Sequence, residues 1–295
     1  MGTHQVLDGR KIAERIKQTL LKEETAVLRA HPQLRVLYFD TTASQVYWQA
    51  QRVAAAALEI GTGVDKSGRE SYKTGSVSCP WNIPQPEVER IIQWWNDDPS
   101  VHGIFVHQPM PVQIDAQRVS ALIDPRKDVE GIHPANCARR FFAKARIGSC
   151  TALAVMELIE STGVALEGKE AVVVGHSEIV GRPVSMLLLD KLATTTICHV
   201  GTDRAGRLES HVRQADVLVV AVGKPQLIKG SWIKSGAIVI DVGINVVNKR
   251  VVGDVEFDEA LKRAAYISPV PGGVGPVTVM MVMKNTVEAF KWQRR

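Results

Sequence analysis

The second half of the chain carries three glycine-bearing turns whose residue types could do binding chemistry. The first runs from Gly175 to Gly181, after the apolar run Glu170–Val174 and before a helix that opens near Pro183. A glycine permits a tight bend there, and free N–H groups at a helix start can bind a pyrophosphate. The spacing departs from G-x-G-x-x-G, and such turns also occur without a ligand. This turn alone therefore leaves nucleotide binding open.

Two later turns favour a nucleotide site. Residues Val222–Pro225 and Asp241–Asn245 follow further apolar runs, each with a glycine. Because the carboxyl ends of parallel strands meet at one edge of a sheet, all three turns are expected at the edge where α/β folds bind ligands.

The segment Ser268–Pro276 is the most unusual part of the sequence. Its prolines fix φ, while its three glycines let the backbone approach another group closely. A rigid loop with exposed amides suits a flat heterocycle or a carboxylate. The alternative is a plain connection between domains.

These turns require an α/β framework. In the first half, Leu34–Phe39 predicts a strand, the stretch from about Ala43 to Ile60 a helix, and Gly103–Val106 a strand that Pro109 ends. In the second half, strands are predicted at 170–174, 195–198, 217–222, 237–242 and 266–267, and a last helix at 277–290. Such near-continuous apolar runs are typical of a parallel sheet covered on both faces.

Composition limits the class of protein. The 295 residues are 45% hydrophobic and 23% charged, which predicts packed cores and, from the length, two domains. The charge of +5 is scattered among acids, so nucleic acid is not an expected partner. No apolar run suggests a membrane span or a signal peptide, so we expect a cytoplasmic protein. The four cysteines form no C-x-x-C pair, which predicts reduced thiols and no metal site.

Six segments, taken together, resemble the methylenetetrahydrofolate dehydrogenase/cyclohydrolase family. They have the family's order and spacing over nearly the whole chain. They are Ser44–Tyr47, Lys127–Gly131, Cys150–Thr151, Val173–Pro183, Asp241–Asn245 and Pro269–Pro276.

The resemblance implies two α/β domains with a cleft between them. Residues 1–145 would form a folate-binding catalytic domain, 146–276 a Rossmann-like nucleotide-binding domain, and 277–295 a C-terminal helix packing back on the first domain. A hydride would pass from the bridging methylene of the folate to C4 of NADP or NAD, a step that depends mainly on positioning. The family also suggests a homodimer.

The same resemblance implies the site residues. Catalytic roles fall to Tyr47, Gln51 and His107; substrate contacts to Tyr47, Val106, Gln108, Glu130, Pro271, Gly272, Gly273, Gly275 and Pro276; and cofactor contacts to Gly175, His176, Ser177, Ile179, Val200, Gly223 and Ile244.

Three of these positions depart from the family pattern. Gln51 stands where the family has the lysine that serves methenyl hydrolysis, and it cannot titrate. His107 stands for the glutamine that partners that lysine, and Glu130 for an aspartate. We therefore expect a dehydrogenase with weak or absent cyclohydrolase activity. The alternatives are a bifunctional enzyme that uses His107 as a base, and a folate-binding pseudoenzyme.

Two more departures concern the cofactor. NADP-using relatives carry an arginine after the first glycine of the turn and a serine after the next strand, where this chain has His176 and Val200. Without the guanidinium, bidentate recognition of a 2′-phosphate is lost, so use of NAD becomes plausible.

Overall fold

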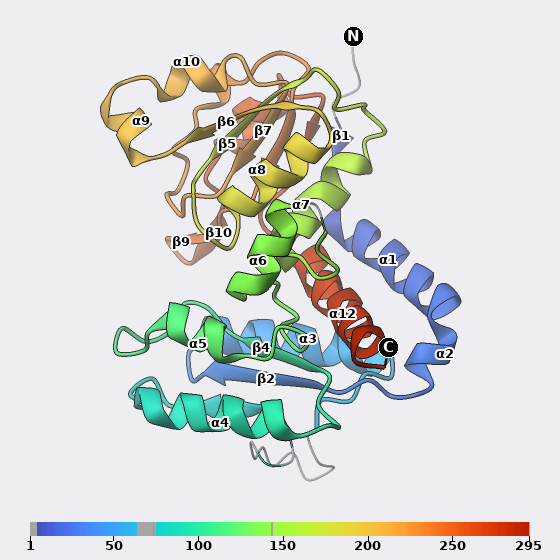
Figure 1. The fold of residues 1–295 in the computed structure, drawn as a ribbon. Coiled ribbons are helices and arrows are strands. Elements are labelled where there is room, and N and C mark those ends of the chain that lie inside the picture. The colour runs from blue at the N-terminus through green and yellow to red at the C-terminus, as the bar shows by residue number, and fades with distance from the viewer. Residues whose placement is uncertain (1–4, 64–72, 74, 143, 295) are drawn as a thin grey trace. The chain divides into compact units, whose positions relative to one another are not determined.

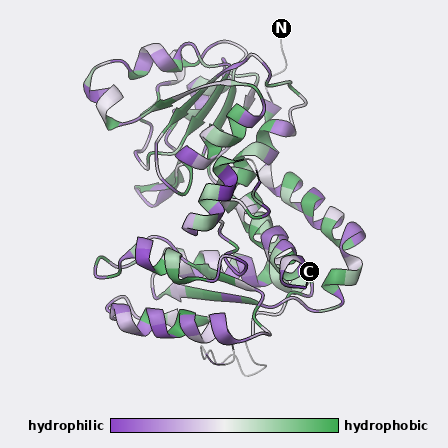
Figure 2. Cartoon of the chain, in the orientation of Figure 1, coloured by the Kyte–Doolittle hydropathy of each residue, from purple (hydrophilic) through white to green (hydrophobic). Residues whose placement is uncertain are grey.

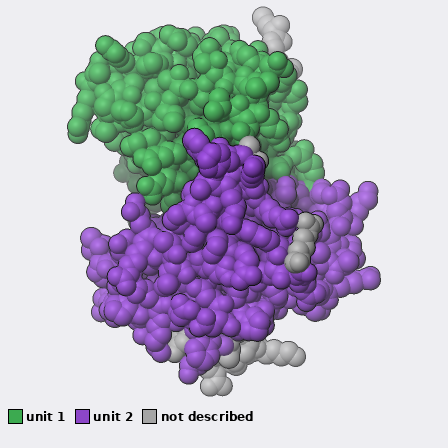
Figure 3. Space-filling model, viewed as in Figure 1, with its two compact units in different colours: residues 1–15, 151–278 green, residues 16–150, 279–295 purple. Residues whose placement is uncertain are grey.

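The computed structural model describes residues 5–63, 73, 75–142 and 144–294. Contacts divide the chain into two compact units, which Figure 3 colours separately. Unit 1 contains residues 1–15 and 151–278, and unit 2 contains residues 16–150 and 279–295. Two helices, α1 (Gly9–Glu23) and α12 (Val274–Gln293), run from one unit into the other. None of the described helices has the length and apolarity that crossing a membrane requires.

Unit 1 is built on a six-stranded, wholly parallel sheet with the order β1-β11-β8-β7-β5-β6. The chain therefore has the predicted α/β class with a parallel sheet. Residues 1–15 belong to this unit, although the predicted domains were continuous stretches, because β1 pairs with β11. The strands are β1 (Gln5–Val6), β5 (Glu170–Val174), β6 (Thr194–Cys198), β7 (Val217–Val220), β8 (Ile238–Asp241) and β11 (Tyr266–Ile267).

Helices cover both faces of this sheet, as its apolar strands require. Val173 and Val219 are fully buried in the centre of their strands. On one face, Val172 and Leu218 pack against apolar residues of α10 and α11, and Figure 2 shows the strands as the most hydrophobic part of the unit. The helical segments are α7 (Cys150–Glu160), α8 (Gly181–Asp190), α9 (Val200–Arg204), α10 (Leu208–Val212), a 3-10 turn (Gly230–Trp232) and α11 (Phe257–Leu261).

A small antiparallel hairpin of β9 (Asn245–Val247) and β10 (Arg250–Val252) follows β8. Its apolar side chains are largely exposed, with Val246 74% accessible. This hairpin was not predicted, because neither strand has the apolar run that marks the other strands.

Unit 2 contains a three-stranded parallel sheet with the order β3-β2-β4. The strands are β2 (Leu34–Phe39), β3 (Val77–Cys79) and β4 (Gly103–Val106), and the helices besides α1 and α12 are α2 (Thr25–Leu28), α3 (Thr42–Ala57), α4 (Gln85–Asp97), α5 (Ala116–Leu122) and α6 (Pro134–Phe141).

Alternate side chains of β2 point to opposite faces of this sheet, and a helix packs against each face. Leu37 and Phe39 point into a cluster with apolar residues of α4 and α5, and Figure 1 shows α4 lying along the sheet. Tyr38 points the other way and stacks on Trp48 of α3, with ring centroids 5.4 Å apart. Helix α3 therefore lies on the face opposite α4, and its side chains reach the end of β4.

Candidate functional site

Helix α3 brings two of the predicted catalytic residues to one face. Thr41 caps the helix by accepting a hydrogen bond from the backbone N–H of Ser44 at 3.3 Å. Tyr47 and Gln51 lie four residues apart, so their side chains share a face. Gln51 is fully buried, whereas Val46, on another face, is 67% exposed.

His107, the first residue after β4, holds this face through both ring nitrogens. Its Nδ1 lies 2.7 Å from the Ser44 hydroxyl, and its Nε2 lies 2.8 Å from Gln51 Oε1. The amide oxygen can only accept, so Nε2 carries the hydrogen and Nδ1 accepts from the serine. The structure therefore brings together Tyr47, Gln51 and His107; the Tyr47 and His107 rings lie 5.1 Å apart.

The environment of His107 keeps the ring neutral. Burial lowers the pKa of His107 from 6.5 to about 3. A neutral imidazole whose one lone pair already receives the Ser44 hydrogen has no free site for a proton at pH 7. His107 therefore acts as a hydrogen-bond partner for Gln51 in this arrangement.

One polar atom of Gln51 is not satisfied by a hydrogen bond among the described residues. Among the described residues, its amide Nε2 is buried and has no hydrogen-bond partner. A buried, unpaired N–H group costs about 1–3 kcal/mol, so an acceptor from a bound molecule would be favoured at this point.

Glu130 sits on a loop that its neighbours fix. Lys127 donates from Nζ to three backbone carbonyls, those of Trp95, Asn96 and Asp98, at the end of α4. Asp128 accepts from the backbone N–H groups of Gly131 and His133 and from the Asn136 side chain. The two residues therefore shape the loop and leave only the carboxyl of Glu130 uncommitted.

Glu130 has no cation beside it in the part of the chain that the structure describes. Burial, with the charge of Asp128 in second place, raises the pKa of Glu130 well above its usual range. Burial and the charges of Cys150 and Glu130 likewise raise the pKa of Tyr47. The site is thus a mostly uncharged, buried set of polar groups, which suits a ring that offers N–H donors.

Asn285, on α12, anchors the Glu130 loop from outside the predicted set. Its side-chain amide donates to the backbone carbonyls of Val129 and Gly148, each at 2.8 Å, and lies 3.3 Å from Cys150 Sγ. This role could not be predicted, because a lone asparagine in an apolar helix matches no motif. The remaining predicted positions here are Val106, buried at the end of β4, and Gln108, half-buried after it.

In unit 1, the turn after β5 can exist only with glycine. Gly175 has φ +123°, and a Cβ there would lie 2.3 Å from the backbone oxygen of Ala221. A Cβ on Gly181 would lie 2.1 Å from the oxygen of Gly175. The N–H groups of His176 and Ser177 donate to no other group within the described segments, so the turn fits a pyrophosphate.

Two buried aspartates join the loops after β7 and β8. Asp254 accepts from the backbone N–H groups of Val222 at 2.7 Å and Gly223 at 2.9 Å. Its other oxygen accepts from the Asn245 side chain at 2.8 Å. Asp241 accepts from three backbone N–H groups nearby, and burial raises its pKa to about 6. Neither aspartate was predicted as a site residue.

Replacing Asp254 by asparagine is expected to weaken nucleotide binding about tenfold, because an amide cannot accept on both sides and leaves a buried N–H group unpaired. Titration of NADH or NADPH fluorescence would measure it. Asp258→Asn, at an exposed site on α11, is the matched control. Unchanged affinity in Asp254→Asn would show that the loops keep their shape without this carboxylate.

The other predicted cofactor positions lie at the carboxyl edge of the same sheet. His176, Ser177 and Ile179 belong to the turn before α8, and Val200 is the first residue of α9. Ile244 follows β8 and is 69% exposed. Parallel pairing of the strands places these turns along one edge.

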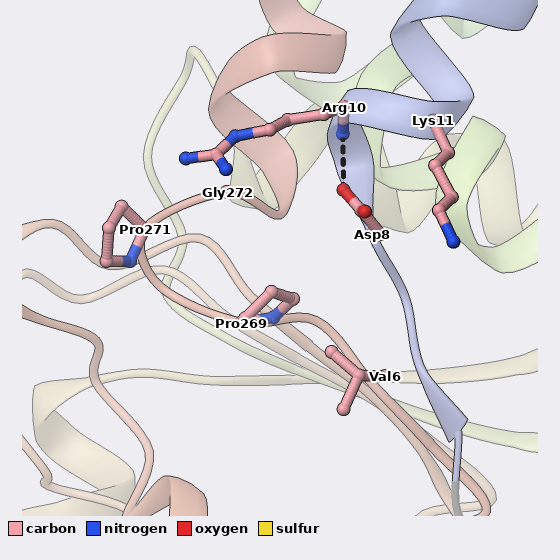
Figure 4. Close-up of a pocket in the computed structure, with 7 residues that line it drawn as sticks. All are labelled: Val6, Asp8, Arg10, Lys11, Pro269, Pro271 and Gly272. Atoms are coloured by element: carbon pink, nitrogen blue, oxygen red, sulfur yellow. Dashed lines mark hydrogen bonds between the residues drawn. The ribbon is translucent and has the colours of Figure 1, made fainter.

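The proline-glycine loop closes a shallow pocket of about 400 Å³ in unit 1. Gly9 donates from its N–H to the oxygen of Gly272 at 2.9 Å, which fastens the loop to the start of α1. Asp8 accepts from the backbone N–H of Arg10, and Figure 4 shows the Arg10 side chain extending toward Gly272 and Pro271. Of the other predicted loop positions, Gly273 is buried, and Gly275 and Pro276 lie in the first turn of α12.

Comparison with known families matches both parts of the chain. The tetrahydrofolate dehydrogenase/cyclohydrolase catalytic domain matches residues 7–130, and the NAD(P)-binding domain of the same family matches residues 149–294. The chain belongs to the tetrahydrofolate dehydrogenase/cyclohydrolase family. Its second half is therefore an NAD(P)-binding domain, as the three turns predicted.

Relatives of this family are similar over the whole length. A bifunctional protein FolD from Nitratiruptor is 40% identical, with 99% of each chain covered, and FolD 2 of Geobacter sulfurreducens is 45% identical over 97% of this chain and 96% of its own. The structure resembles that of methylenetetrahydrofolate dehydrogenase-cyclohydrolase from Trypanosoma brucei, complexed with NADP and an inhibitor. That protein is 39% identical, with a TM-score of 0.90 and full coverage of both chains.

Proposed function

We propose that this chain oxidises 5,10-methylenetetrahydrofolate to 5,10-methenyltetrahydrofolate with NADP or NAD, and that it hydrolyses the product weakly or not at all. The observation that carries the dehydrogenase part is the full-length family match joined to a pyrophosphate-binding turn whose glycines are sterically required. The relatives named above are called bifunctional, so the hydrolytic part of the proposal rests on this chain's own residues.

The proposed dehydrogenase step requires little acid–base catalysis by the protein. When bound, the nicotinamide supplies the hydride acceptor, and the substrate nitrogens stabilise the cation that remains. Within unit 2, the Tyr47 ring would position the substrate, while the Glu130 carboxyl and the Gln51 amide would bind polar atoms of the pterin.

Weak hydrolysis is supported by the side chains at positions 51 and 107. Gln51 cannot take a proton from water, and the neutral His107 already uses both ring nitrogens. Removal of a general acid or base commonly costs about 10²–10⁴-fold in rate. The geometry thus favours His107 as a partner of Gln51 over the alternative in which it is a substitute base.

An absorbance assay tests the proposal. Purified protein given methylenetetrahydrofolate and either cofactor should form the methenyl product, which should then decay hardly faster than in buffer. Rapid decay would refute the hydrolytic part. Binding of folate without turnover by either cofactor would instead favour the pseudoenzyme.

A homodimer is also part of the proposal. The β9–β10 hairpin exposes Val246 and Val251, which pair across it, and contiguous exposed apolar side chains often mark interfaces. Sedimentation equilibrium would give the mass in solution.

A further inference from the structure

The end of β6 is where this type of sheet selects between NAD and NADP. The turn after the first strand holds the pyrophosphate, and a side chain after the neighbouring strand contacts the ribose 2′ position. Here β5 is that first strand and β6 pairs beside it at the sheet edge. An acidic residue there typically selects NAD, and an arginine nearby accommodates the 2′-phosphate.

This chain has neither group directly after β6. The residue that follows Cys198 is His199, and its ring centroid lies 5.3 Å from that of His176, which follows the glycine of the pyrophosphate turn. Both side chains are exposed. Two imidazoles from two separate turns therefore meet at the ribose position. His176 stands where the NADP-using pattern has an arginine, and His199 directly precedes Val200, which stands where that pattern has a serine.

Local hydrogen bonds fix the His199 ring. Its Nδ1 accepts from the backbone N–H of Gly201 at 3.1 Å, while the backbone N–H of His199 donates to the Thr202 hydroxyl at 3.2 Å. This reciprocal cap at the start of α9 commits Nδ1 and leaves the Nε2 edge available. His176 makes no hydrogen bond with its side chain in the described part of the chain, so its ring is free to engage a ligand.

We propose that His176 and His199 form a pH-sensitive clamp for the 2′-phosphate, so that the preference for NADP over NAD strengthens as the pH falls. The proposal builds on the NAD(P)-binding domain and does not require folate turnover. Imidazole is the side chain that changes charge between pH 5 and 8, and its cation forms charge-assisted hydrogen bonds with phosphate. Deprotonation removes that attraction for NADP and leaves NAD, which lacks the phosphate, unaffected.

Other charged side chains lie on the elements that carry the two imidazoles. Glu178 and Arg182, on the turn and on α8, form an exposed ion pair at 3.7 Å. Asp203 and Arg204 lie side by side in the sequence of α9, and Lys224 follows β7. These groups are carboxylates, guanidinium groups and an ammonium group, and none of them is an imidazole.

The 2′-phosphate itself titrates in a way that makes the test decisive. The second pKa of a phosphate monoester is about 6, so the ligand gains negative charge as the pH rises. A site that used only arginine or lysine would therefore bind 2′-phosphate better at pH 8 than at pH 6. A histidine clamp gives the opposite trend from about pH 6.5 upward.

The experiment compares 2′,5′-ADP with 5′-AMP, two probes that differ in the 2′-phosphate, by calorimetry between pH 6.5 and 8 on the intact protein. The affinity ratio is expected to fall about tenfold over this range, because each lost imidazolium removes a charge-assisted bond. A ratio that stays constant or rises with pH overturns the clamp. Since neither probe can be turned over, failure of the proposed dehydrogenase activity would not affect the outcome.

Four variants assign the effect to the pair. His199→Asn keeps a good helix cap while removing the titrating ring, and His176→Asn does the same for the turn. Each should flatten the pH dependence, and together they should abolish it. His176→Arg should raise the ratio and leave it high at pH 8. His211→Asn, on α10, is the matched control. A double asparagine variant that keeps the parent's pH dependence overturns the proposal.

Discussion

The double variant Gln51→Lys, His107→Gln is expected to hydrolyse methenyltetrahydrofolate about 10²–10⁴-fold faster than the parent, the range that one restored proton-transfer group provides. Its dehydrogenase rate should change little. The reason lies in the hydrogen bond between the two side chains. His107 donates from Nε2 to Gln51 Oε1. A lysine introduced alone would place its ammonium donor next to the His107 N–H, with no acceptor between them. A glutamine at position 107 offers a carbonyl oxygen instead.

The factor by which the double variant raises the hydrolysis rate should therefore exceed the product of the factors for the two single variants. Gln51→Lys alone can be accommodated only if His107 changes tautomer and Ser44 turns its hydroxyl to accept, so a smaller gain is expected. Burial further disfavours the lysine cation, although the nearby Glu130 carboxyl lacks a partner cation among the described residues and could offset this cost.

Gln49→Lys, on the exposed face of the same helix, controls for added charge. The measurement is the decay of methenyl absorbance, with dehydrogenase turnover as the check on folding. If the parent already hydrolyses at the rate of its dehydrogenase step, or if the double variant is no faster than Gln49→Lys, Gln51 is not the residue that limits hydrolysis.

The strands with continuous apolar runs could be predicted closely from the sequence. The bounds predicted for β2, β4 and β5 are confirmed residue for residue, because glycine, proline or polar residues end each run. The stretch predicted as a helix to Ile60 ends instead at Ala57. β1 and β3, of two and three residues, were missed, since their pairing depends on partners far away in the chain.

Residues of the candidate site could be predicted only where they belong to a recognisable sequence motif. Tyr47, Gln51 and His107 were proposed together, and they do lie together. The role of Ser44 was not predicted, although its segment was noted, because a contact between residues 63 positions apart leaves no local pattern. Asn285 was missed for the same reason: its contribution is a set of bonds that exists only after folding.

The pH dependence of stability follows from the buried imidazole. The pKa of His107 falls from 6.5 in the unfolded chain to about 3 in the folded protein. Between these values the unfolded chain binds a proton that the folded protein does not, so stability is full above pH 6.5 and is lost as the pH falls toward 3. Each unit of difference is worth about 1.36 kcal/mol, so His107 alone should remove about 3 kcal/mol between pH 7 and pH 4.5.

His107→Gln is expected to abolish the part of the pH dependence of stability that is due to His107. Glutamine can still accept from Ser44 and donate to Gln51 Oε1, yet it has no proton to bind over this range. Urea unfolding of parent and variant at pH 7 and pH 4.5 measures the difference directly. Other groups, including His102, whose pKa burial lowers to about 4, titrate in both proteins and cancel from the comparison. The parent should lose about 3 kcal/mol more than the variant on acidification. Equal losses would mean that His107 binds a proton as readily in the folded protein as in the unfolded chain, and a His107 that can take up a proton would make the substitute-base mechanism tenable again.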